Sequence, residues 1–223
     1  MRPIVVINFK TYKESTGELG LKLAKICDDT AKEYKLDIFI APQVSDIYRI
    51  SKNVKIPVFA QHIDAISYGS NTGHVLAEAI KEAGASGSLI NHSEKRLTLA
   101  DIEFCVRKLK ELSMSSIVCS NNIETTKAIA ALEPDFVAIE PPELIGSGIP
   151  VSKAQPDIVS NAVDAAREVS KKVKILCGAG ISTWEDLKAA IDLGTDGVLL
   201  ASGIVKAKDQ KNALLNLIGP LKN

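Results

Sequence analysis

Three side chains with acid–base chemistry stand at or just after the ends of short apolar runs: Lys10, His92 and Glu140. Glu140 directly follows such a run, where a carboxylate is costly unless it is paired or has a function. Taken singly, Lys10 is also typical of a solvated surface lysine and His92 of a structural histidine. Taken together, a carboxylate can move a proton, an imidazole can polarise a carbonyl, and an ammonium group can stabilise an oxyanion.

Two other apolar runs end in loops of small residues. Residues 177–180 read Cys-Gly-Ala-Gly, and residues 201–203 read Ala-Ser-Gly. Backbone N–H groups of such loops, placed before a helical turn, can bind a phosphate. The glycines could equally serve only the tight turns from strand to helix. The loops make Gly180, Ala201 and Ser202 candidate phosphate-binding residues.

The elements that would position these residues are eight apolar runs separated by helical patterns. Near-continuous Val, Ile, Leu and Phe stretches are typical of parallel strands that are buried on both faces. Eight strands close a (β/α)8 barrel, in which the active site lies at the carboxyl ends of the strands. The candidate residues would then share one rim. The predicted strands are 4–7, 38–41, 58–60, 88–90, 116–119, 136–139, 174–177 and 197–200.

Amphipathic segments between the runs supply the connections that parallel strands need. Capping boxes, in which Glu follows three residues later, predict helix starts at Ser15, Asn121 and Ser182. The segments 47–51 and 123–131 leave room only for short helices. We expect a compact α/β barrel with some shortened helices, forming a single domain over residues 1–223. An open doubly wound sheet stays possible, although no G-x-G-x-x-G pattern follows the first run.

The composition is that of a soluble globular protein, with 46% hydrophobic and 24% charged residues in a chain of 223. Lys+Arg and Asp+Glu number 27 each, and this balance argues against a general attraction to nucleic acid or to an anionic membrane. No targeting segment and no long apolar span is expected. The four scattered cysteines predict buried thiols and a cytoplasmic location. No metal-ligand spacing is present, so no metal site is predicted.

The order of these motifs resembles the triosephosphate isomerase family from end to end. Residues 7–10 (Ile-Asn-Phe-Lys) resemble its N-terminal Asn–Lys motif, and residues 92–96 (His-Ser-Glu-Lys-Arg) resemble its histidine motif. Residues 138–142 (Ala-Ile-Glu-Pro-Pro), followed by residues 145–148 (Ile-Gly-Ser-Gly), resemble its catalytic glutamate and lid loop. The short chain is similar to the compact archaeal branch of that family.

The resemblance implies an isomerase of glycolysis and gluconeogenesis that interconverts glyceraldehyde 3-phosphate and dihydroxyacetone phosphate through an enediolate, with no cofactor. Glu140 would be the base and His92 a neutral electrophile. Lys10 would stabilise the enediolate and help to hold the substrate anion. Asn8 would position Lys10. A lid, residues 141–148, would desolvate Glu140 and raise its pKa. The remaining residues implied to contact the substrate are Ile145, Gly146, Gly180, Ala201 and Ser202.

Some segments depart from the common pattern of the family or leave their role open. The family usually carries Tyr-Gly-Gly-Ser after strand seven and Gly-Gly after strand eight, but small residues here keep the backbone donors. Glu94 resembles the motif glutamate of the family, and a helix-start or a structural role is the alternative. The loop 62–74 is long, and function is the usual reason for such length, although a mobile surface loop is the alternative. The resemblance implies that this loop docks into a neighbouring subunit of a homotetramer, a dimer of dimers. The rival interpretations are another phosphate-binding barrel enzyme and a catalytically dead barrel that serves as a scaffold.

Overall fold

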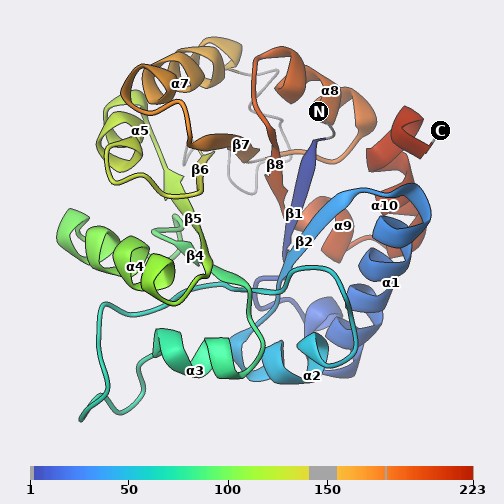
Figure 1. The fold of residues 1–223 in the computed structure, drawn as a ribbon. Helices are drawn as coiled ribbons and strands as arrows, with labels where there is room; N and C mark the ends of the chain where they lie inside the picture. The colour runs from blue at the N-terminus through green and yellow to red at the C-terminus, as the bar shows by residue number, and fades with distance from the viewer. Residues whose placement is uncertain (1–2, 141–154, 179, 223) are drawn as a thin grey trace.

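Eight parallel strands form one sheet in the computed structural model, which describes residues 3–140, 155–178 and 180–222. The order in the sheet is β2-β1-β8-β7-β6-β5-β4-β3. Between the two end strands, Ile40 bridges Val58 in parallel, and the backbone N–H of Ile40 donates to Pro57 at 3.1 Å. This contact closes the sheet into a barrel, as Figure 1 shows, and excludes the open doubly wound sheet.

All eight predicted strands are present, with ends that differ from the prediction by at most one residue. They are β1 Ile4–Asn8, β2 Asp37–Ala41, β3 Phe59–Ala60, β4 Gly87–Ile90, β5 Ser115–Ser120, β6 Phe136–Ile139, β7 Lys174–Gly178 and β8 Gly197–Leu200. Strand β3 is the shortest because Val58 takes part only in the single bridge to β2.

Helices surround the barrel on the outside (Figure 1). Their bounds are α1 Glu18–Tyr34, α2 Ile47–Ser51, α3 Ala77–Glu82, α4 Leu99–Glu111, α5 Ile123–Ala130, α7 Pro156–Val169, α8 Trp184–Asp192, α9 Ser202–Val205 and α10 Gln210–Ile218. Short 3₁₀ segments lie at Lys13–Ser15, Val44–Asp46 and Gly219–Lys222. The expectation of short helices at 47–51 and 123–131 is confirmed.

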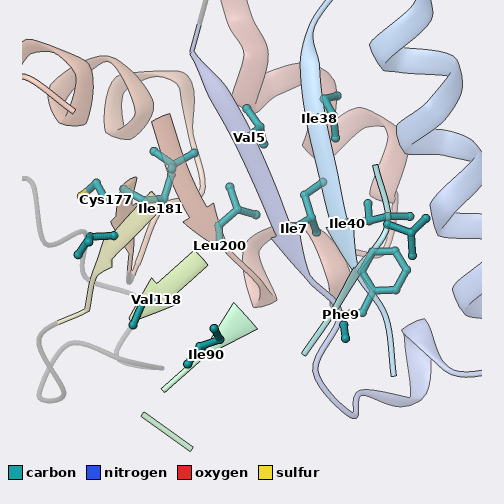
Figure 2. Close-up of a cluster of buried hydrophobic side chains, with 14 of the residues drawn as sticks. Val5, Ile7, Phe9, Ile38, Ile40, Ile90, Val118, Cys177, Ile181 and Leu200 are labelled. Atoms are coloured by element: carbon teal, nitrogen blue, oxygen red, sulfur yellow. The ribbon is translucent and has the colours of Figure 1, made fainter. Parts of the chain in front are cut away.

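Two apolar layers hold the barrel together because successive side chains of a strand point to opposite faces. On β1, Val5 and Ile7 point outward to the layer beneath the helices, together with Ile38 and Ile40 of β2 (Figure 2). The inner layer fills the barrel and comprises Ile4, Val6, Ala41, Phe59, Leu89, Ile117, Cys119, Phe136, Ala138, Leu176 and Leu199. Burial on both faces is the physical reason for the near-continuous apolar runs.

The capping residues lie one or two positions later than the sequence predicts. Helix α8 is capped by Thr183, which makes a capping box with Asp186, and not by Ser182. Helix α5 is capped by Asn122, whose Oδ1 accepts from the N–H of Thr125 at 2.8 Å. Helix α1 follows Gly17, which makes no side-chain cap. Near each wrongly predicted cap stands a second residue that can cap a helix, or a glycine. The sequence pattern alone therefore could not determine which residue is the N-cap.

The loop between β3 and α3 projects away from the barrel, at the lower left of Figure 1. Its base is fixed by Asp64, whose Oδ1 lies 2.9 Å from Nε2 of His62 and whose Oδ2 accepts from the N–H of Val75 at 2.7 Å. Tyr68, further along the loop, is 76% exposed. The predicted long loop is therefore present and carries a large exposed aromatic side chain.

All four cysteines are buried thiols, as expected. Within the described part of the chain, no helix has the length and apolar character that crossing a membrane requires.

Candidate active site

The ends of β1 and β6 bring Asn8 and Glu140 into the mouth of the barrel. Val6 and Ala138 belong to the inner apolar layer, and the residues two positions further along face the same way. Asn8 and Glu140 continue this alternation and line one pocket, although each is no more than 5% exposed. Their place at the rim therefore follows directly from the period of the strands.

Asn91 turns the chain at the end of β4 and so places His92 in the same pocket. It has a left-handed backbone, with φ of 59°, a conformation that asparagine tolerates better than most residues. Its Nδ2 donates to the carbonyl of Cys119, and its Oδ1 accepts from the N–H of Leu97, each at 2.9 Å. Arg96 donates to the Asn91 carbonyl at 2.9 Å. These three bonding partners fix the turn that carries the imidazole.

The ring of His92 is oriented by the backbone of Glu94. The N–H of Glu94 donates to Nδ1 at 3.2 Å, so Nδ1 is an acceptor. A neutral imidazole that accepts at Nδ1 carries its proton on Nε2. Nε2 lies 3.5 Å from Oε1 of Glu140. The proton of the ring is thus directed into the pocket, where it could polarise a carbonyl oxygen.

Glu140 is a buried carboxylate that lines the pocket. Burial alone would raise its pKa, but a hydrogen bond from His92 and the attraction of its ring when protonated, with smaller contributions from Cys119 and Lys10, hold the pKa of this carboxyl below its ordinary value. The expected rise in pKa on desolvation is therefore outweighed here. Oε2 has no hydrogen-bond partner among the described residues. A buried ionised oxygen without a hydrogen-bond partner is suited to accept a proton from a substrate that reaches it.

Gly178, at the end of β7, leaves the space that Glu140 occupies. A Cβ atom at position 178 would overlap Cγ of Glu140 and approach its Oε1 to 3.1 Å. Any larger residue would displace the carboxylate. Sequence reasoning explained this glycine only by the tight turn, because the neighbour that excludes a side chain lies on another strand.

Lys10 adopts a left-handed backbone, with φ of 48°. Its N–H donates to Oδ1 of Asn8 at 3.0 Å, which fits the expectation that Asn8 positions it. Its Nζ lies 2.9 Å from Oε1 of Glu94, with the lysine side chain 15% exposed and the glutamate 59% exposed. The ammonium group is thus held at the edge of the pocket that Lys10 shares with His92 and Glu140.

Glu94 does not start a helix, so the helix-start role considered in the sequence analysis is wrong. It lies in the turn after β4, whereas α4 begins at Leu99 with Thr98 as its cap. Its side chain pairs with Lys10, and its Oε2 lies 3.6 Å from Nδ1 of His92. The residue links the cation and the imidazole of the site.

The pocket encloses about 570 Å³ of empty space, part of it open to solvent. Two loops of small residues also line the pocket. Gly180, with φ of 73°, follows β7, and Ala201 and Ser202 open the short helix α9. Gly203 packs the two loops together, because a Cβ there would lie 2.7 Å from Oγ of Ser182.

The structure brings together most of the predicted site residues in this one pocket: Asn8, Lys10, His92, Glu140, Gly180, Ala201 and Ser202. Ile145 and Gly146, with the lid 141–148, lie outside the described residues. The pocket also contains residues that sequence reasoning missed, namely Tyr12, Ile181, Ser182, Leu199, Leu200 and Gly203. They flank the predicted residues in the sequence, so the position next to each motif was the available signal. Among the described residues, no group of three His, Cys, Asp or Glu side chains could hold a metal ion.

Comparison with known proteins assigns the family. The model of the family described as triosephosphate isomerase matches residues 3–219. The curated triosephosphate isomerase of Methanothermus fervidus is 64% identical over 217 residues, which cover 97% of this chain and 98% of the relative. The chain belongs to the triosephosphate isomerase family. The triosephosphate isomerase of Methanocaldococcus jannaschii is 59% identical over 215 residues, 96% of this chain and 98% of the relative.

A solved triosephosphate isomerase, from Bartonella henselae, supports the fold assignment. The two structures are similar with a TM-score of 0.75, over 98% of this chain and 100% of the other, at 19% sequence identity. Such a likeness bears on the barrel alone, since so few residues are shared. The sequence-based expectations of the family and of the barrel are both confirmed.

Proposed function

We propose that this chain interconverts D-glyceraldehyde 3-phosphate and dihydroxyacetone phosphate, the reaction that gives the triosephosphate isomerase family its name. The observation that carries the proposal is the contact between Glu140 and the Nε2 side of His92 inside a pocket that ends in two small-residue loops. A base and a neutral hydrogen-bond donor placed this close are the two groups that enolisation of a hydroxycarbonyl compound needs. No cofactor is required for this chemistry.

In the proposed mechanism Glu140 removes a proton from the carbon next to the carbonyl and returns it to the other carbon. Its unpartnered Oε2 and its lowered pKa both favour an ionised, available base. A substrate bound between Glu140 and His92 would replace their present contact. Loss of that contact removes the main cause that lowers the pKa of Glu140, so burial then makes the carboxylate a stronger base.

His92 would polarise the carbonyl and pass protons between the two oxygens of the enediolate. The bond from the Glu94 N–H to Nδ1 supports a neutral ring whose only proton is on Nε2. Lys10 would stabilise the negative charge that develops on these oxygens and help to hold the substrate anion, since it lines the same pocket. Asn8 would hold Lys10 in place through its backbone N–H.

The phosphate of the substrate would be bound by backbone N–H groups of Gly180, Ala201 and Ser202, with Ile145 and Gly146 completing the site. The first N–H groups of a helix have no partner within it, and α9 begins at Ser202 against the pocket. Oriented N–H groups do not depend on the side chain, so the departures from the common family pattern preserve the donors.

We also propose that residues 1–223 form one functional domain and that the protein is a homotetramer, a dimer of dimers. The projecting loop with Tyr68 at 76% exposure supports an assembly in which this side chain is covered. We place the enzyme in the cytoplasm, where buried thiols persist. Light scattering of the purified protein tests the assembly, and a monomer with full activity would contradict it.

The experiment that tests the function is a coupled assay of the purified chain with glyceraldehyde 3-phosphate. Turnover that is lost in Glu140→Gln supports both the reaction and the base. A folded protein that leaves the substrate unchanged would contradict the proposal and favour a different sugar phosphate or the scaffold interpretation.

A further inference from the structure

We infer that Gln61 is a positioning residue of the active site, which acts by fixing the backbone of Lys10. Gln61 directly follows β3 and lies far from Lys10 in the sequence. Its Nε2 donates to the carbonyl of Lys10 and to the carbonyl of Ala41, each at 2.9 Å. The inference rests on the proposed function, because it assumes that Lys10 contacts the substrate.

The orientation of the amide is determined by its two partners. Both are carbonyl oxygens, which only accept hydrogen bonds, so the NH₂ group of Gln61 must face them. The amide has two N–H bonds, and each finds one acceptor. A flipped amide would direct an oxygen at two other oxygens, which is repulsive. The amide of Gln61 therefore has one favoured orientation, with its NH₂ group bridging the carbonyls of Lys10 and Ala41.

Lys10 needs such support because its backbone is in a conformation that a lysine rarely adopts. Its φ is 48°, where the side chain of an L-residue crowds its own carbonyl. The N–H of Lys10 is held by Asn8 and its carbonyl by Gln61, so side chains fix both ends of the residue. Without the bond to the carbonyl, the peptide can relax to negative φ, and the ammonium group then points elsewhere.

The bridge also ties Lys10 to the end of the neighbouring strand. The Ala41 carbonyl accepts from Gln61 and from the N–H of Phe9, the residue before Lys10. Gln61 thus fixes the position of the Lys10 peptide relative to the ends of β2 and β3.

Two roles of Gln61 make different predictions. A purely structural role, in which Gln61 joins the ends of three strands, predicts only a lower free energy of unfolding when Gln61 is replaced. A positioning role also predicts weaker binding of the substrate anion through Lys10 in particular.

A double-mutant cycle separates these roles. Gln61→Met keeps the length of the side chain and removes the donor. Binding of inorganic phosphate would be followed by NMR of the Ala201 and Ser202 amides, which does not depend on turnover. We expect Gln61→Met to raise the phosphate Kd by about fivefold in the wild-type background, the size of one lost hydrogen bond, and to leave it unchanged in the Lys10→Met background.

Asn53→Leu is the matched control, because Asn53 Nδ2 also donates to a backbone carbonyl, that of Arg49, at 2.8 Å, outside the pocket. It should leave phosphate binding unchanged. Gln61→Glu, which replaces the donor by an acceptor, is a second variant in case Gln61→Met does not fold. An equal rise in Kd in both backgrounds, or no rise at all, would overturn the inference. Loss of the proposed function is seen separately, as absence of turnover by the wild-type protein.

Discussion

Oε1 of Glu140 lies 3.5 Å from Nε2 of His92, across the mouth of the barrel. The carboxylate follows β6 and the imidazole lies in the turn after β4, and these two strands flank β5, so the contact depends on the order of strands in the sheet and not on local sequence. It holds the pKa of Glu140 low in the free protein, against the effect of burial. A substrate that separates the two groups would make the base stronger when it is needed.

The first prediction concerns this pKa. The carboxyl of Glu140 should titrate below its ordinary value of 4.5 in the wild-type protein, and above that value in His92→Gln, where burial remains and the contact is lost. A carboxyl with a lowered folded pKa adds stability above its ordinary pKa, and this stability is lost as the pH falls through the folded pKa. Carbon-13 NMR, assigned by difference from Glu140→Gln, measures both midpoints. A wild-type midpoint above 4.5 would contradict the argument.

The second prediction concerns the space beside Glu140. Gly178→Ala should lower kcat by about one to two orders of magnitude, because a displacement of about 1 Å in a catalytic group is that costly. Phosphate binding should change much less, since the loop donors are untouched. Equal activity of Gly178→Ala and the wild-type protein would show that the close approach to Glu140 has no consequence.

The third prediction concerns the ion pair of Lys10 and Glu94. Glu94→Gln keeps the shape of the side chain and removes its charge, so Lys10 becomes less restrained. The glutamate is 59% exposed, and an exposed pair has a small effect, so kcat/KM should fall only about threefold to fivefold. Lys10→Met should lower kcat/KM far more than Glu94→Gln, because it removes the cation itself. Steady-state kinetics of both variants provide the comparison, and equal losses would contradict this division of roles.

The fourth prediction concerns helix capping. Asn122→Ala should lower the free energy of unfolding by about 1 kcal/mol, because it removes the bond to the N–H of Thr125. Asn121→Ala, at the position that the sequence pattern favours, should cost less than about 0.5 kcal/mol. Urea unfolding of the two variants distinguishes the two cap positions. A larger loss for Asn121→Ala would mean that the cap is at the earlier residue.

The sequence predicts the eight strands, the location of the site at their carboxyl ends and the main site residues, because each of these depends on a pattern of a few neighbouring residues. Glu140 follows an apolar run, and Asn8 continues the alternation of β1, so their places need no tertiary information. Other features depend on distant partners. The left-handed Asn91, the space at Gly178 and the bridge from Gln61 involve residues on different strands. No local pattern marks such partners, so the sequence could not predict them.

The central claim is that Glu140 is the base of a sugar-phosphate isomerase. The most direct test measures turnover of glyceraldehyde 3-phosphate by the wild-type chain and by Glu140→Gln, with phosphate binding measured in both. We predict rapid turnover by the wild-type protein, a kcat about a thousandfold lower or more in the variant, and nearly equal phosphate Kd values. A variant with turnover close to that of the wild-type protein would contradict the assignment of the base. A folded wild-type protein without turnover would contradict the function itself.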